Sequence, residues 1–174
     1  MSETHEGATV HDLRQLFVDQ HRSLFRYLVR LSGDADLAED GAQEAFVRLF
    51  ERPPARDVQR AWLFKVATNV VLEHLRTHAR RKRIATGAMA RLPIGDPSPD
   101  PHERLESMER HEAASEALGV LSSKERAAVL MREEGFSHRE IAVAIGTTTG
   151  AIGTLIARSL IKVADALPAE RDVH

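Results

Sequence analysis

The residues best suited to chemistry in this 174-residue chain lie between Ala61 and Arg83. Polar and charged side chains recur there every three or four residues, which is the spacing that aligns them along one side of a helix. This set, called the Asn69 row below, consists of Trp62, Lys65, Asn69, Glu73, Arg76 and Arg80. An amide can donate and accept hydrogen bonds on the edge of a base, and cations can neutralise phosphates. The pattern indicates a nucleic-acid-binding face; the alternative is a solvated helix face with a basic end.

The same stretch carries a second stripe that must be buried, because its apolar residues also fall at helical spacings. They are Leu63, Phe64, Val66, Ala67, Val70, Val71 and Leu75. A run of four cations from Arg80 to Arg83 closes the stretch. Cations there suit the negative end of the helix dipole and would also suit phosphate. We therefore expect one long helix with a buried side and a recognition side.

The composition favours an all-helical protein. Hydrophobic residues make up 43% of the chain and charged residues 29%, while only 5% are aromatic and strand-favouring runs are missing. The chain has no cysteine, which excludes disulfides, thiolate zinc sites and a cysteine nucleophile. No apolar run approaches membrane-spanning length, and residues 1–12 lack the apolar core of a signal peptide. We expect a cytoplasmic protein with no membrane insertion of its own.

The charge is strongly segregated, although the formal net charge is only −2. Residues 61–91 carry seven Lys and Arg against one Glu, whereas residues 92–121 carry two cations against seven acids. A chain that binds DNA unaided through broad electrostatics is usually basic overall. We expect this one to need a partner or a rearrangement of its own, and the acidic stretch could shield the basic helix in the free protein.

Two helices are expected before the Asn69 row. The first is predicted over residues 13–32, with Gly33 as a C-terminal stop. The second begins with a cap at Asp34 or Asp36 and ends before Pro53. A loop then leads to the long helix, for which Asp57 is a plausible cap. Complementary apolar stripes predict a three-helix bundle over residues 10–85.

The remainder of the chain divides into a linker and a second helical unit. Residues 86–103 are rich in Pro, Gly and Asp without periodicity and are predicted to be an interdomain linker. Residues 104–168 form the second unit. Its clearest signals are two capping boxes, in which a serine is followed three residues later by a glutamate, at Ser122 and Ser137.

Helix ends in this second unit are equally well marked. Gly135 and Gly146 stand where a left-handed residue terminates a helix, and Phe136 can fold back on Met131. The last helix is expected to begin at a cap on Thr147 or Thr148 and to run to about residue 167. A short helix, a tight turn and a second helix match the spacing of a helix-turn-helix.

Catalytic and cofactor-binding patterns are not found. No glycine-rich phosphate loop follows a strand, and the serines act as caps rather than standing beside a base. His74 and His78 share a helix face at a metal-binding spacing but lack a third ligand. We therefore expect that the protein is not an enzyme and that it binds neither a cofactor nor a metal ion.

Together these segments resemble a sigma factor of the sigma-70 family, of the small two-domain extracytoplasmic-function (ECF) type. Such factors are the promoter-specificity subunits of bacterial RNA polymerase. The resemblance spans about residues 13–167 and is carried by four motifs in order. They are Asp36 to Asp40 with Gln43 to Phe46, Ala61 to Phe64 with Ala67 to Asn69, the Pro/Asp linker, and Ser137 to Gly150.

The resemblance implies a role for each segment. Residues 10–85 would be sigma region 2, which binds core polymerase, melts the promoter and recognises its −10 element. Its acidic outer face would meet the β′ clamp through Asp36, Glu39, Asp40, Gln43 and Glu44. Contacts to the −10 region are expected from Arg56, Asp57, Gln59, Trp62, Lys65, Asn69, Glu73, Arg76, Arg80, Arg81 and Arg83. For Trp62, packing is favoured over stacking on a base.

Residues 104–168 would be sigma region 4, a helix-turn-helix that recognises the −35 element. The expected contacts are Arg139, Thr148, Thr149, Thr154, Arg158 and Lys162. The last helix is poor in cations for this family, so its recognition would rest on DNA shape and phosphate contacts. Gly153 inside that helix suggests close approach of DNA backbone or of another helix. Thr68 and Glu73 also depart from the family's usual residues, so base preference cannot be copied from relatives.

The resemblance also implies partners. They are the β′ and β subunits of core polymerase, promoter DNA and an anti-sigma protein that holds a stress- or signal-responsive factor inactive. Two other readings of the residues stay open. One is a free-standing helix-turn-helix regulator; the other is an anti-sigma-like adaptor, which would leave the basic cluster from Arg80 to Arg83 unexplained.

Overall fold

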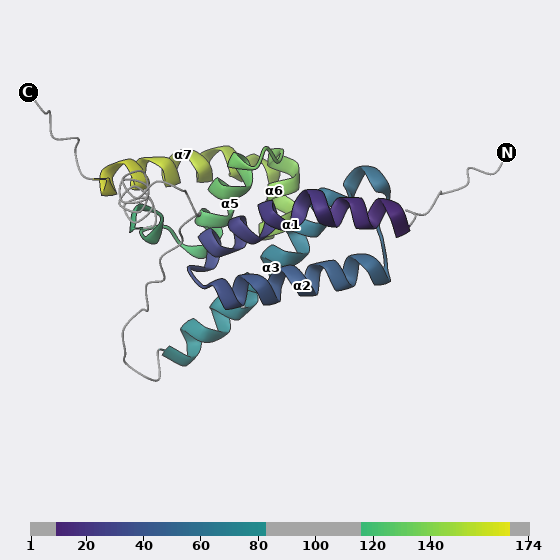
Figure 1. Cartoon of the computed structure of the whole chain (residues 1–174). Coiled ribbons are helices and arrows are strands. Elements are labelled where there is room, and N and C mark those ends of the chain that lie inside the picture. Colours follow the sequence, from purple (N-terminus) through teal and green to yellow (C-terminus); the bar gives the residue numbers. More distant parts are fainter. Residues whose placement is uncertain (1–9, 83–115, 168–174) are drawn as a thin grey trace, which may run out of the picture.

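The computed structural model describes residues 10–82 and 116–167, together with the side chains of residues 11–78 and 116–167. Within these ranges the chain contains helices and no strand. The linker expected at residues 86–103 lies outside the described residues. We call residues 10–82 the first module and residues 116–167 the second module (Figure 1).

The first two helices are α1 (Val10–Ser32) and α2 (Ala35–Glu51). Between them Gly33 adopts φ +71°, a left-handed conformation that glycine reaches without steric cost. The side chain of Asp34 caps α2, since it accepts hydrogen bonds from the backbone N–H groups of Asp36 and Leu37 at 3.0 and 3.1 Å. The predicted stop is confirmed, and Asp34 rather than Asp36 is the cap.

The third helix, α3 (Gln59–Lys82), follows a single 3-10 turn, η1 (Arg56–Val58). The N–H of Val58 bonds to the carbonyl of Ala55 at 3.1 Å, so the chain is already winding before α3 begins. Asp57 lies inside that turn. Its prediction as a helix cap is therefore wrong.

The core of the first module joins all three helices. Gly41 of α2 lies so close to α3 that a Cβ atom built there would stand 2.9 Å from Cγ2 of Val71. A buried hydrogen bond of 2.7 Å joins the hydroxyls of Tyr27 on α1 and Thr68 on α3. Burial raises the pKa of Tyr27 well above its usual range, so its hydroxyl stays protonated. The bond satisfies the phenol in an otherwise apolar interior.

The second module contains α5 (Ser123–Glu133), α6 (His138–Ile145) and α7 (Thr149–Ala166). Both predicted capping boxes are present, at the starts of α5 and α6. Thr148 occupies the N-cap position of α7, but its hydroxyl makes no capping hydrogen bond. The axes of α6 and α7 are bent by 90°, as a helix-turn-helix requires.

The turn between α5 and α6 closes as the sequence predicts. Gly135 has φ +89°, and its N–H donates to the carbonyl of Arg132 at 3.0 Å. The N–H of Phe136 donates to the carbonyl of Met131 at 3.1 Å. These two bonds form a Schellman motif, which fixes the backbone at Phe136 and with it the direction of the Phe136 side chain. Gly146 ends α6 in the same left-handed region, with φ +68°.

The two modules pack on each other, which nothing in the sequence indicates. In Figure 1 the second module lies along α1 and α3, and α6 packs chiefly against α3. Buried apolar residues of both modules form one cluster, which includes Phe64 of α3 and Phe136 of the α5–α6 turn. The long helix therefore has a third side, which is covered by the second module.

We predict that Tyr27→Phe destabilises the protein by about 1–3 kcal/mol, because the hydroxyl of Thr68 stays buried without its partner. Thr68→Val removes the second hydroxyl at similar volume, so the double variant should regain part of that loss. Chemical denaturation of the four proteins measures the coupling. Strictly additive losses would contradict a direct bond between the two side chains.

Candidate nucleic-acid interface

The Asn69 row lies along one side of α3. Asn69, Glu73 and Arg76 are exposed, and Arg76 donates to the Glu73 carboxylate at 2.9 Å. Lys65 is half-buried. Trp62 is half-buried and packs against the hydrophobic core, which agrees with the packing role favoured for it. Arg80 and Arg81 lie on α3 with side chains outside the described residues, and Arg83 lies wholly outside them.

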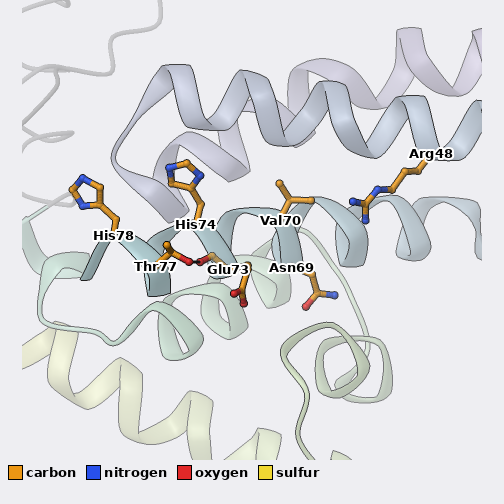
Figure 2. Close-up of a pocket in the computed structure, with 7 residues that line it drawn as sticks. All are labelled: Arg48, Asn69, Val70, Glu73, His74, Thr77 and His78. Carbon is orange, nitrogen blue, oxygen red and sulfur yellow. Dashed lines mark hydrogen bonds between the residues drawn. The ribbon is translucent and has the colours of Figure 1, made fainter. Parts of the chain in front are cut away.

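Asn69 and Glu73 form a ridge between two hollows. On one side a groove of about 570 Å³ runs between α2 and α3. Its lining residues are Arg48, Asn69, Val70, Glu73, His74, Thr77 and His78. Figure 2 shows Val70 and His74 pointing toward the α2 side of this ridge, whereas Asn69 and Glu73 point toward the ribbon of the second module. The groove offers a recess beside an exposed amide, which suits an unpaired base.

On the other side a crevice of about 360 Å³ separates α3 from the second module. It is lined by Asn69, Leu72, Glu73, Arg76, Lys124, Val143, Ile145 and Gly146. The row is thus open on one flank and covered on the other.

Arg48 is a groove residue that the sequence analysis missed. It belongs to α2, where it donates to the Glu44 carboxylate at 2.7 Å, four residues earlier. Only the crossing of α2 over α3 brings it beside Asn69. Helical spacing within α2 gives no signal of that neighbour.

The loop before α3 only partly matches the expected contacts. Arg56 forms an ion pair with Asp12 of α1, and Asp57 is exposed. Gln59 is only 3% exposed, and its amide donates to the carbonyl of Pro54 at 3.2 Å. A direct contact from Gln59 to DNA is therefore not available in this conformation. Its side chain instead holds the loop against the start of α3.

The second module presents its expected contacts on α6 and α7. Arg139, Thr148, Thr149, Thr154 and Arg158 are all exposed. For Gly153, a Cβ atom would lie 3.7 Å from the imidazole of His138, which is ordinary van der Waals contact. Close approach of a neighbouring helix therefore does not explain this glycine within the described residues.

Lys162 is held by its own protein. Its ammonium donates to the Glu125 carboxylate at 2.7 Å, which ties α7 to the start of α5. The hydrogen bond from Lys162, helped by the backbone N–H of Ser122, lowers the pKa of Glu125 to about 2. No sequence pattern predicts this pair, because its members are 37 residues apart. Lys162 is thus a structural cation in this conformation.

The acidic face expected to contact the polymerase lies on α2, away from the second module. Asp36, Glu39, Asp40 and Gln43 are exposed, while Glu44 is half-buried beside Arg48. Two apolar side chains of the same helix, Val47 and Phe50, are 45% and 46% exposed. The face therefore combines acids with exposed apolar surface.

Other classes of site find no support in the described ranges, 10–82 and 116–167. They contain no group of three or more His, Cys, Asp or Glu side chains able to hold a metal ion. No single helix there is long and apolar enough to cross a membrane, and α6 with α7 meets that criterion only as a bent pair.

Comparison with known proteins decides the family. Residues 16–81 match the family described as Sigma-70 region 2, and residues 111–163 match Sigma-70, region 4. The ECF RNA polymerase sigma factor SigL of Mycobacterium tuberculosis (strain ATCC 25618 / H37Rv) is 31% identical over 147 residues, covering 80% of each chain. This chain is an ECF sigma factor of the sigma-70 family.

Other relatives agree with this ECF sigma factor assignment. SigE of Mycolicibacterium smegmatis (strain ATCC 700084 / mc(2)155) is 34% identical over 164 residues, covering 86% of this chain and 60% of SigE. Sigma factor RpoE in complex with the anti-sigma factor NepR, from Bartonella quintana, gives a TM-score of 0.70 at 22% identity, covering 93% of this chain and 100% of the matched one. CnrH in complex with the cytosolic domain of CnrY gives 0.63 at 21%, covering 94% and 92%. These two structures share the fold.

The Glu125 bond predicts a pH-dependent stability. The folded pKa of about 2 lies below the ordinary value of 4.5, so the stabilisation is complete above about pH 4.5 and is lost as pH falls toward 2. Glu125→Gln should therefore lower the melting temperature most above pH 4.5, with the difference shrinking at lower pH. Thermal unfolding across this range, with Glu39→Gln as a control for the lost charge, measures it. If the loss of melting temperature in Glu125→Gln did not depend on pH, the carboxylate of Glu125 would not be the source of this stabilisation.

Proposed function

We propose that this sigma factor binds core RNA polymerase and directs it to promoters by reading the −10 element with the Asn69 row and the −35 element with α6 and α7. The observation that carries the proposal is the ridge of Asn69 and Glu73 beside an open groove of about 570 Å³. An exposed amide at the edge of a recess, flanked by cations, is an arrangement that accepts unpaired bases.

Within the first module, separate residues would take separate parts of the promoter. Asn69 would bond a base edge, with Arg48 and His74 lining the recess that receives the base. Lys65 and Arg76 would neutralise phosphates. To do so, Arg76 must replace its bond to the Glu73 carboxylate with a bond to a phosphate. The basic run Arg80, Arg81 and Arg83 would extend this contact along the backbone. We assign residues 10–85 to this module.

The loop before α3 would act as the rim of the recess. Arg56 and Asp57 are exposed there and can approach a nucleotide. Gln59 shapes the loop through its bond to Pro54, and Trp62 anchors it to the core. Gln59 and Trp62 would thus hold the loop in the position from which Arg56 and Asp57 reach a nucleotide.

The exposed side of α2 is the surface we assign to the β′ clamp. Its acids Asp36, Glu39 and Asp40 with Gln43 would meet basic residues, because opposite charge steers association. The adjoining apolar Val47 and Phe50 add surface whose burial would stabilise the contact. Glu44 is already paired with Arg48, so its carboxylate would contribute less to this attraction than the acids that are unpaired in the described structure.

The second module, assigned to residues 104–168, would bind duplex DNA at the −35 element. Thr148 and Thr149 begin α7 at the helix-turn-helix turn, and Thr154 and Arg158 follow on that helix. Threonine hydroxyls and helix N-termini chiefly position a protein on phosphates. Among these expected contacts Arg139 and Arg158 are the exposed cations not bonded to an acid in the described structure, while Lys162 is bonded to Glu125, so this module would rely on backbone contacts and DNA shape.

We further propose that the protein is an alternative factor held by an anti-sigma protein until a signal releases it, with residues 86–103 as the linker and β as a second polymerase contact. Its structural neighbour RpoE was solved with an anti-sigma factor, which supports this. The protein would act in the cytoplasm, joining the nucleoid with polymerase. Recognition and strand opening require no catalytic residue or cofactor of its own.

Run-off transcription with core polymerase on genomic fragments tests the function. We expect initiated transcripts, and Asn69→Ala should lower initiation by about fivefold or more, because a lost base-edge contact is worth about 1–3 kcal/mol. Gln15→Ala, an amide removed from exposed α1, should leave initiation unchanged. Specific duplex binding without polymerase, combined with no transcripts, would instead identify a free-standing helix-turn-helix regulator.

Gly153 gives a prediction for the −35 surface. Because a Cβ atom fits against His138, Gly153→Ala should stabilise α7 by about 1 kcal/mol through helix propensity. If DNA backbone approaches this glycine, the same variant should transcribe less from promoters that depend on the −35 element. Ala157→Gly, on the same exposed helix, should destabilise without that loss. Unchanged transcription by Gly153→Ala would remove the DNA explanation for the glycine.

A further inference from the structure

An ion pair connects the loop before α3 to the first turn of α1. Arg56 of this loop donates to the carboxylate of Asp12. The side chain of Asp12 is 19% exposed and that of Arg56 is 72% exposed. Asp12 lies where the helix dipole of α1 stabilises a negative charge. In Figure 1 the connection from α2 to α3 passes beside this end of α1. The pair therefore joins a largely shielded acid of the bundle to an exposed cation of the loop.

Other bonds hold the two ends of the loop. The Gln59 amide donates to the carbonyl of Pro54 at 3.2 Å. Arg60, at the start of α3, donates through Nε to the Gln20 amide oxygen of α1 at 3.0 Å. Arg56 and Arg60 are four residues apart, and their partners on α1 are eight residues apart. The first helix thus holds the start of α3 at two points about 12 Å apart along its axis.

The middle of the loop depends on such side-chain bonds for its position. Pro53 and Pro54 have no backbone N–H, so they cannot donate the hydrogen bonds that order a helix or a strand. Residues 55–58 are all exposed, so burial in the core does not fix them. The position of η1 therefore rests on a few hydrogen bonds and on the ion pair with Asp12.

The ion pair also changes what Arg56 can contribute to DNA binding. A phosphate at Arg56 must compete with a carboxylate that belongs to the same chain and is always present. The pair is thus poorly suited to attract DNA from solution. It is well suited to orient a loop, because a guanidinium is planar and directs its N–H groups in a fixed pattern.

We propose that Asp12 is a positioning residue for base recognition: by holding Arg56, it sets where η1 presents Asp57 to a nucleotide of the −10 element. The inference rests on the proposed function for what the loop contacts, whereas the tether itself does not. The exposed carboxylate of Asp57 is repelled by phosphates and can bond only to donor groups on a base edge. Such contacts require placement within about 0.5 Å. A shift of η1 therefore lowers base preference more than it lowers stability.

The loop and Asn69 contact different nucleotides. Gln59 begins α3, and Asn69 follows ten residues later, about 15 Å along the helix axis. That length corresponds to about four base steps at the 3.4 Å spacing of B-DNA, and to fewer in an extended strand. A displaced loop must therefore change the preference for the base beside it and leave the base at Asn69 unaffected. A general loss of stability would instead lower transcription from every sequence alike.

Amide hydrogen exchange of the free, full-length protein tests the tether. Asp12→Asn removes the charge at nearly equal volume. We expect the N–H of Val58, which bonds to the carbonyl of Ala55, to exchange about threefold faster in this variant. Asp12→Glu keeps the charge and should reverse part of the change. The matched control is Asp19→Asn, an exposed acid on α1 whose partner Gln15 lies on the same helix. Unchanged exchange at Val58 in Asp12→Asn would overturn the tether.

Transcription from a promoter library tests the positioning role. A promoter that the native protein transcribes with core polymerase is randomised in its −10 element, and sequencing of the transcripts gives the base preference at each position. We expect Asp12→Asn to reduce the preference at one position by about fivefold. Asn69→Ala should reduce it at a different position, Asp12→Glu should retain most of it, and Asp19→Asn should change neither position.

Two other outcomes of this experiment would overturn the proposal. A uniform loss of transcription from all sequences, with a lower melting temperature, would make Asp12 a structural residue only. Tighter and more salt-dependent DNA binding with unchanged base preference would mean that Asp12 only masks Arg56. If the native protein gave no transcripts with core polymerase, the proposed function would fall together with the base-reading role of the loop. The exchange measurement would still decide the tether, because it needs neither polymerase nor promoter.

Discussion

The packing of Phe136 is the constraint on which the arrangement of this protein depends. Its backbone N–H completes the Schellman motif that ends α5, and the next residue begins the capping box of α6. The position of its side chain is therefore set by local hydrogen bonds before any contact with α3 is made. Because that side chain is only 2% exposed and lies against Phe64, the geometry of one turn fixes how the second module meets the first.

The long helix α3 has three different sides: a buried apolar stripe, the Asn69 row and the side covered by the second module. Only the first two could be predicted from the sequence. Its apolar stripe and its Asn69 row follow helical spacing, so the bundle and the polar face were predictable. Thr68 on the same helix does not fit either pattern, since it is fully buried but polar. Helical spacing does not predict that such a polar residue is buried, because its burial depends on a hydroxyl partner on another helix, Tyr27. Turn and cap residues such as Gly33 and Ser137 were predictable for the opposite reason, since their hydrogen bonds are local.

The candidate site shows the same division between local and distant information. The exposed amide of Asn69 follows from its place on the helix. Gln59 was expected at the surface and is instead turned inward by a bond to Pro54, a loop carbonyl whose direction no sequence pattern specifies. Lys162 was expected to meet DNA, but a carboxylate 37 residues earlier, Glu125, holds it. The side chains whose surroundings differ from expectation are thus the two that have a partner outside their own helix.

These internal pairs also bear on how an acidic chain can act on DNA. Of the seven cations in the proposed DNA surfaces whose side chains are described, four are held by acids of the same protein: Arg48 by Glu44, Arg56 by Asp12, Arg76 by Glu73 and Lys162 by Glu125. A phosphate must replace a carboxylate at each, so the gain from such a contact is smaller than for a free cation. Sequence-independent DNA binding arises mainly from phosphate contacts and the counterions that they release. Ion pairs within the protein therefore weaken sequence-independent binding most. Base-edge contacts such as that of Asn69 need no such exchange. A protein built this way gains little from random DNA and depends on polymerase to hold it where the bases are unpaired.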